Sequence, residues 1–203
     1  QMQARGEHVT PEHMFQVAHR SPDNWDHDDT ATVERDADDP PTWAPVDLSQ
    51  FLDGTYVQPT PTMFPRSDGV CLVYPGFTHS FHGESESGKS LIVLVEAVRL
   101  IMAGQRVLFV DFESDAASVV GRLLEFGASA AAIKYWFVYI RPEVSPHSGR
   151  ERDAWLDVLT GTFTLAIVDG VTDSLGMFGF STKENDDITA WAQMLPRRIA
   201  DRT

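Results

Sequence analysis

The residues whose types and spacing could do chemistry begin with a phosphate-loop pattern. Residues 83–90 form a complete G-x-x-x-x-G-K-S sequence. Glycines let the backbone wrap around a phosphate, and N–H groups of the loop and of the following helix then point inward. Lys89 brings a positive charge, and Ser90 brings a hydroxyl that can bind Mg²⁺. The pattern predicts a nucleotide-phosphate loop consisting of Gly83, Glu84, Ser85, Glu86, Ser87, Gly88, Lys89 and Ser90.

Two carboxylates inside this loop work against its predicted ligand. Glu84 and Glu86 stand within a few residues of the expected phosphate position. Like charges at short range repel one another, so these side chains must point to solvent or to a neighbouring subunit.

A carboxylate also ends an apolar run further along the chain. The sequence Leu-Ala-Ile-Val-Asp at 165–169 predicts a strand that ends at Asp169. Ligands of open parallel sheets bind at the carboxyl ends of the strands, where a phosphate loop also lies. We therefore expect Asp169 to hold Mg²⁺ through water, beside Ser90.

A second acidic strand end supplies a candidate for the catalytic base. The buried run before Asp111-Phe112-Glu113 is expected to end at the same edge of the sheet, and side-chain alternation gives Asp111 and Glu113 the same parity. A carboxylate one water away from a γ-phosphate could deprotonate the attacking water. We assign that role to Glu113, and we expect Asp111 to be a structural residue or one that supports the site from behind. The alternative is a helix N-cap group, with Ser114 or Asp115 capping the next helix.

The loop has to be positioned by a strand before it and a helix after it. Residues 70–74 and 77–82 are predicted as two strands around the turn Pro75-Gly76. A helix begins near Lys89, and Gly104 closes it. Apolar residues recur along this helix at helical spacing and form a stripe. Because further apolar residues flank the stripe, little of the helix circumference is polar, which predicts that the helix is buried against a sheet. The stripe consists of Leu91, Val95, Val98 and Met102.

Downstream of this helix, short apolar runs alternate with helical patterns. Such alternation predicts right-handed crossovers and an α/β fold with a mostly parallel, helix-covered sheet. The expected strands are 107–110, 136–140 and 164–168, and the expected helices are 116–126, 128–134, 150–159 and 185–201.

Charge divides the chain into parts. The first 50 residues carry 11 acidic and 3 basic residues, and so a net −8 of the total −14. This stretch has no sustained apolar period and ends in a proline-rich segment, so it cannot bury enough surface to offset its ordering entropy. We predict an acidic disordered arm at 1–45, a linker at 46–68 and the core domain at 69–203.

Composition excludes several classes of protein. One cysteine, Cys71, cannot form an internal disulfide, which argues against a disulfide-stapled secreted scaffold. Charged residues interrupt the longest apolar run, 91–104, and the first 20 residues contain no apolar stretch typical of a leader. We therefore expect a soluble, cytoplasmic protein without a membrane partner. The acidic balance also argues against coating nucleic acid by bulk charge.

Together these motifs resemble those of RecA-like P-loop ATPases. More narrowly, the loop with His82 before it, the segment 168–172 and the sequence Leu-Pro-Arg-Arg-Ile-Ala at 195–200 look like AAA-family ATPases similar to RepA-like hexameric replicative helicases of actinobacteria and their phages. The resemblance covers about residues 46–203. It implies a three-layer RecA-like core that binds ATP and Mg²⁺. By the same resemblance, Lys89 and Ser90 contact phosphate and metal, Asp169 is the Walker B acid and Glu113 is the catalytic glutamate.

The resemblance further implies a hexameric ring that acts on DNA. RecA-like cores continue with a strand that carries a polar sensor residue, so we expect this chain to be incomplete at its C-terminus. The basic cluster could supply an arginine finger or a DNA contact, or it could be cations near a helix C-terminus without function. Its members are Arg197, Arg198 and Arg202.

Two other functions stay open on the sequence alone. The chain could be a nucleotide-binding switch whose acidic arm recruits a partner and whose turnover is incidental. A small-molecule P-loop kinase is a third possibility, although the sequence contains no arginine-rich lid segment.

Overall fold

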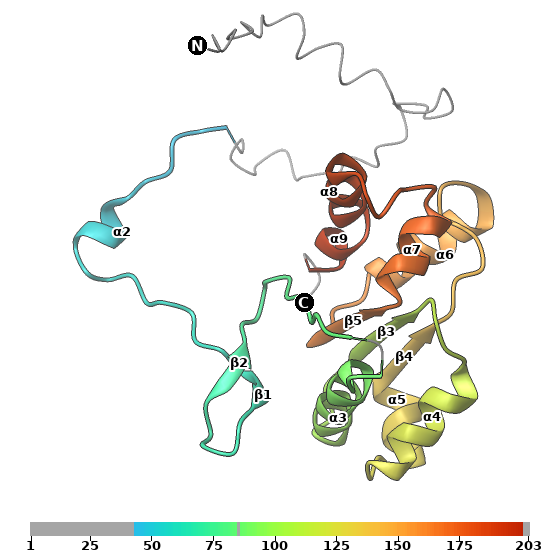
Figure 1. The fold of residues 1–203 in the computed structure, drawn as a ribbon. Helices are drawn as coiled ribbons and strands as arrows, with labels where there is room; N and C mark the ends of the chain where they lie inside the picture. Colours follow the sequence, from blue (N-terminus) through green and yellow to red (C-terminus); the bar gives the residue numbers. More distant parts are fainter. Residues whose placement is uncertain (1–42, 85, 201–203) are drawn as a thin grey trace, which may run out of the picture. The chain divides into compact units, whose positions relative to one another are not determined.

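The computed structural model describes residues 43–84 and 86–200 of the chain (Figure 1). The chain forms two units, Gln1–Thr55 and Tyr56–Thr203. Within the first unit the described part holds one short, exposed helix, α2 (Ser49–Leu52). The predicted arm at 1–45 lies almost wholly outside the described residues, and the stretch expected as a linker spans both units.

The second unit opens with a short antiparallel hairpin. Its strands are β1 (Met63–Pro65) and β2 (Cys71–Val73), paired so that Met63 faces Val73. Gly69 closes the turn between them, because its positive φ of 83° suits glycine and its N–H donates to the carbonyl of Arg66 at 2.9 Å.

The prediction of a second strand at 77–82 is wrong. The chain has no regular structure there, and β2 pairs with the segment before it instead. Local hydrogen bonds compete with strand pairing in this stretch. The N–H of Tyr74 donates to Nε2 of His79 at 3.1 Å, and Ser80 Oγ lies 2.9 Å from Nε2 of His82. The phosphate-loop pattern is therefore preceded by an irregular segment rather than by a strand.

A three-stranded parallel sheet forms the centre of the second unit, which confirms the predicted α/β class. The strand order is β4-β3-β5. Every residue of the central strand is buried, in keeping with its apolar run before Asp111. The strands are β3 (Val107–Asp111), β4 (Phe137–Ile140) and β5 (Leu165–Asp169).

Helices cover both faces of this sheet (Figure 1). Alternate residues of β3 enter two separate cores: Val107 and Phe109 pack with the first group of helices, and Leu108 and Val110 with the second. The first group is α3 (Lys89–Met102), α4 (Ala116–Glu125) and α5 (Ala130–Trp136). The second group is α6 (Gly149–Leu159), α7 (Val171–Met177), α8 (Asn185–Met194) and α9 (Pro196–Ala200). None of the described helices has the length and apolar character needed to cross a bilayer.

The predicted buried stripe of α3 is wrong in detail. Of its four members only Val98 is buried, whereas Leu91, Val95 and Met102 are between 43% and 53% exposed. The helix instead turns a different face to the core, and that face includes Leu94 and Ile101. Apolar residues occupy nearly the whole circumference, so spacing alone could not select the face that packs on β3 and β5.

Two further differences lie after β5. Helix α7 was not predicted, and Asp173 stands in its first turn. The single helix expected at 185–201 is divided into α8 and α9 at Pro196. Proline has no N–H and clashes with the preceding turn, so it can begin α9 but cannot continue α8.

Adjacent leucines of α4 test the orientation of that helix. Leu123 is fully buried, and Leu124 is 49% exposed. We expect Leu123→Ala to lower the free energy of unfolding by about 2–5 kcal/mol, and Leu124→Ala to change it by less than about 0.5 kcal/mol. Urea unfolding of both variants measures the difference. Equal losses would show that α4 does not pack as described.

Candidate phosphate-binding site

Helix α3 begins inside the phosphate-loop pattern. Gly88 is its N-cap, with a φ of 83° that places it in the left-handed region. Glu86 has a φ of 61°, a conformation that costs a residue with a side chain about 1 kcal/mol or more. These two residues turn the chain sharply so that the first N–H groups of α3 come next to the loop. A helix N-terminus of this kind attracts anions.

Lys89 folds back over the loop that precedes it. Its Nζ donates to the carbonyl of Gly83 at 2.9 Å, to the carbonyl of Glu84 at 2.6 Å and to Oγ of Ser87 at 3.2 Å. An ammonium group has three N–H donors, and this arrangement uses all of them. The loop therefore holds a positive charge within it, and a phosphate oxygen that binds Lys89 must replace at least one of these acceptors.

The remaining loop residues fit this description. Ser90 is partly buried in the first turn of α3. Glu84 and Glu86 are exposed, so their charges are screened by water. Ser85 lies outside the described residues.

Two strand ends with carboxylates lie side by side at the carboxyl edge of the sheet. Asp111 of β3 and Asp169 of β5 are register partners, and the N–H of Phe112 donates to the carbonyl of Asp169 at 2.9 Å. Gly170 follows in the left-handed region, at a φ of 85°. A Cβ on Gly170 would lie 3.0 Å from Cβ of Phe112 and 3.1 Å from the backbone nitrogen of Glu113. The segments that follow β3 and β5 therefore approach each other closely at Gly170, and an added Cβ would require its neighbours to shift by a few tenths of an ångström.

Asp111 is the buried acid of this edge, with no exposed surface. Its Oδ1 accepts from the N–H of Glu113 at 3.0 Å and from that of Ser114 at 2.7 Å. Its Oδ2 accepts from the hydroxyl of Tyr139 at 2.9 Å. The pKa of Tyr139 is raised to about 12. Burial is the largest cause, and the hydrogen bond to Asp111 is the second. Asp111 thus closes the turn after β3, in agreement with its predicted structural role.

Glu113 lies in a different environment from Asp111, although their parity along the chain is the same. Glu113 is exposed and stands beyond the end of β3. Asp115 caps α4, with its carboxylate accepting from the N–H of Ser118 at 3.0 Å. Among the described residues, neither a hydrogen bond nor an ion pair engages the Glu113 carboxylate. The capping role considered for this acidic run therefore falls to Asp115, and the Glu113 side chain remains available to solvent or a ligand.

The structure brings Asp111, Glu113 and Asp169 together, but it does not join them directly to the loop. Within the described ranges, no hydrogen bond or ion pair links residues 83–90 to the three acids. Helix α3, which carries Lys89 and Ser90, packs on β3 and β5 through its core face. The described part of the chain also contains no cluster of three or more His, Cys, Asp or Glu residues suited to a metal. A cation here would need oxygen ligands from phosphate and water as well.

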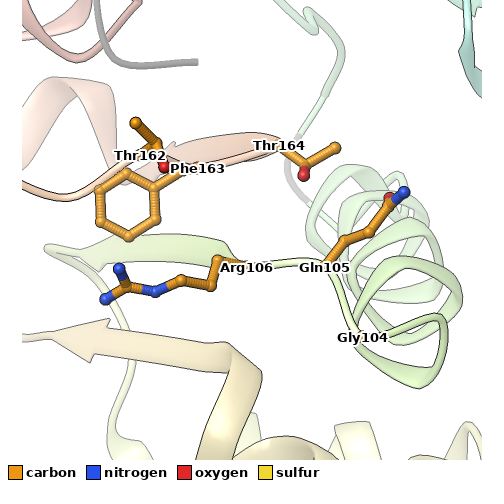
Figure 2. A pocket seen from close by; sticks show the side chains of 6 residues that line it. All are labelled: Gly104, Gln105, Arg106, Thr162, Phe163 and Thr164. Carbon is orange, nitrogen blue, oxygen red and sulfur yellow. The ribbon is translucent and has the colours of Figure 1, made fainter.

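An open hollow of about 400 Å³ lies at the opposite edge of the sheet (Figure 2). It is lined by residues that precede β3 and β5, including Arg106, Phe163 and Thr164. The Arg106 guanidinium stacks on the Phe163 ring, 5.1 Å from its centroid, and the carbonyl of Arg106 accepts from the N–H of Thr164. These contacts join the amino ends of the two strands, so Arg106 has a packing role there.

Comparisons with models of protein families, with curated proteins and with solved structures find no match for this chain. The fold itself defines an α/β protein with a parallel sheet between two layers of helices. The site is defined by the Lys89 loop at the start of α3 and by the acids that end β3 and β5.

Two glycines after β5 test the close approach between the segments that follow β3 and β5. We expect Gly170→Ala to lower the free energy of unfolding by about 1–3 kcal/mol, because its φ is left-handed and the added Cβ meets Phe112 and Glu113. Gly176 lies in α7 with nothing within 4 Å of an added Cβ. Gly176→Ala should be neutral or stabilise the protein by up to about 1 kcal/mol. Thermal and urea unfolding measure the stability of the two variants. Equal changes in stability would contradict the close approach at Gly170.

The raised pKa of Tyr139 predicts a loss of stability at high pH. An unfolded tyrosine titrates near pH 10, and Tyr139 titrates at about 12 in the fold. The folded state binds this proton more tightly, so the stabilisation is complete below pH 10 and disappears as the pH rises toward 12. Tyr139→Phe has no such proton. Urea unfolding from pH 8 to 11.5 should show the stability advantage of wild type over Tyr139→Phe shrinking above pH 10, and a constant advantage would contradict the prediction.

Proposed function

We propose that this chain binds ATP with Mg²⁺ and hydrolyses it, as a RecA-like P-loop ATPase. The observation that carries the proposal is the position of Lys89, whose ammonium group donates three hydrogen bonds to its own loop at the N-terminus of a 14-residue helix. A polyphosphate is bound by a positive charge and by the N–H groups at the start of a helix, and a left-handed glycine shapes the backbone so that these groups come together.

In this proposal the loop recognises the β- and γ-phosphates. Lys89 exchanges its contact with a carbonyl of Gly83 or Glu84 for a phosphate oxygen, and charge-assisted hydrogen bonds of this kind are stronger than neutral ones. The N–H groups at the start of α3 bind the same anion through the helix dipole. Exposure of Glu84 and Glu86 keeps their repulsion of the phosphates screened.

The chemistry of the oxygen donors fits Mg²⁺. Ser90 offers a hydroxyl and Asp169 a carboxylate, both hard ligands of the kind that Mg²⁺ accepts together with water and phosphate oxygens. When bound, the cation would neutralise charge on the phosphates and orient them. Asp169 occupies the end of β5, where its backbone is fixed by the Phe112 hydrogen bond.

Glu113 is the proposed general base. Its carboxylate accepts a proton from a water molecule as the water oxygen bonds to the γ-phosphorus. The bond from that phosphorus to the β–γ bridging oxygen breaks, and ADP and inorganic phosphate leave. Asp111 and Gly170 support this role, because they fix the backbone from which the Glu113 side chain extends.

The wider part of the proposal, a hexameric ring that uses ATP to act on DNA, is supported by the motif resemblance. Arg197 and Arg198 are its candidates for an arginine finger or a DNA contact, and the third member of the cluster, Arg202, lies outside the described residues. Turnover that rises on addition of DNA would support this part. ATP hydrolysis at the same rate with and without DNA would contradict the DNA role.

Two substitutions separate the two proposed roles of the site. Lys89→Ala should raise the dissociation constant of Mg·ATP more than about tenfold, because the positive charge of the loop is lost. Glu113→Gln should bind Mg·ATP with nearly unchanged affinity and lose about 10²- to 10⁴-fold in kcat. Calorimetric titration measures binding, and phosphate release measures turnover.

Matched controls come from exposed residues away from the site. Lys134→Ala and Glu125→Gln should behave as wild type in both assays. Normal turnover by Glu113→Gln would remove Glu113 from the mechanism. Binding by wild type without measurable turnover would favour the nucleotide-binding switch, and unchanged binding by Lys89→Ala would refute the phosphate site.

A further inference from the structure

Phe64 has a backbone conformation that a bulky residue rarely adopts. Its φ is 56°, in the left-handed region that favours glycine. A residue of this kind is strained and persists only where its surroundings enforce it. Phe64 and Glu86 are the two described residues other than glycine with a positive φ, and Glu86 belongs to the phosphate loop.

A buried carboxylate on α3, paired with the half-exposed Arg99, holds the backbone of Phe64. Oε1 of Glu96 accepts from the N–H of Phe64 at 3.0 Å. Arg99 donates to both oxygens of the same carboxylate, at 2.8 and 2.6 Å. Glu96 is only 4% exposed, so the contact is well shielded from water. It lies seven residues after Lys89, two turns along the same helix.

The ring of Phe64 lies against the chain that enters the loop. Its centroid is 5.2 Å from that of Phe81, and the two planes meet at 38°. Phe81 stands two residues before Gly83, whose carbonyl accepts from Lys89. The hairpin residue Phe64 therefore contacts the segment before the loop through its ring and the helix after the loop through its N–H.

We propose that Phe64 is a positioning residue for the phosphate loop, with Phe81 and Glu96 as the contacts through which it acts. The proposal rests on the proposed function and adds a determinant of nucleotide affinity outside the loop. Residues 77–82 are not part of the sheet, so strand pairing does not hold the entry to the loop. The Phe64–Phe81 contact supplies that restraint.

The energetic consequence falls on ligand binding. Without the contact, residues near Phe81 gain conformational freedom, and nucleotide binding must then order them. Fixing the backbone of one residue costs about 1–2 kcal/mol. Loss of the restraint over one residue should therefore raise the dissociation constant of Mg·ATP about tenfold.

The experiment compares two phenylalanines of the same irregular segment. Phe81 is 40% exposed and touches Phe64, whereas Phe77 is 61% exposed and touches Tyr74. Phe81→Ala should weaken Mg·ATP binding about tenfold, with a Tm close to that of wild type. Phe77→Ala should leave both values unchanged, and Phe81→Tyr, which keeps the ring, should bind as wild type does.

A double-mutant cycle tests whether Phe64 acts through Phe81. If it does, Phe64→Ala should weaken binding about as much as Phe81→Ala, and the double variant no more than either one. Phe64 is buried, so Phe64→Leu serves as its replacement if the alanine variant does not fold. Additive losses would show that the two residues act independently and would overturn the proposal.

Hydrogen exchange of the nucleotide-free chain gives a readout that does not depend on ATP. Phe81→Ala should speed amide exchange in residues 81–88, and Phe77→Ala should not. If wild type binds Mg·ATP but the two variants match in affinity and exchange, the positioning role fails and the proposed function survives. If wild type does not bind Mg·ATP, the proposed function fails and takes the role in affinity with it, whatever the exchange rates show.

Discussion

The carboxylate of Asp111 is the interaction on which the rest of the site depends. A buried charge is costly unless several hydrogen bonds satisfy it, and Asp111 accepts three, from Tyr139 of β4 and from two N–H groups of its own turn. One group thus ends the central strand, joins it to its neighbour and bends the chain toward α4. Asp111 is fully buried and engaged in this way, whereas Glu113, two residues further on, is exposed.

Helix α3 packs against the same central strand, on one face of the sheet. Its core face packs on β3 and β5, which fixes the helix that carries Lys89 and Ser90. The N-terminus of α3 is thereby held by tertiary packing rather than by a strand leading into the loop. Glu96 connects this helix to the hairpin, because its carboxylate accepts a hydrogen bond from the N–H of Phe64.

Local residue patterns predict part of this fold, but they do not predict the features that depend on residues distant in the sequence. The strands β3 and β5 and the helices α4 and α6 follow from apolar runs, caps and glycines within a few residues, and they were predicted nearly to their ends. The face of α3 was not predictable, because apolar residues surround the helix. The segment 77–82 has the alternation of a strand, but His79 and His82 bond locally instead. The Asp111–Tyr139 contact joins residues 28 positions apart, which no local pattern reveals.

The two non-glycine residues with a positive φ lie at positions that no sequence pattern marks as strained. Nothing in the residue types around Phe64 indicates a left-handed backbone, because glycine and asparagine are the usual signals. The residue that holds Phe64 in this conformation is Glu96, which accepts from its N–H and lies 32 residues further along the chain. Glu86 has the same kind of conformation within the loop pattern itself. Strain of this size is retained only where the fold enforces it, and here it occurs in the loop and in the residue that contacts the chain entering it. This coincidence is the physical reason to treat hairpin, helix and loop as one unit in any account of ligand binding.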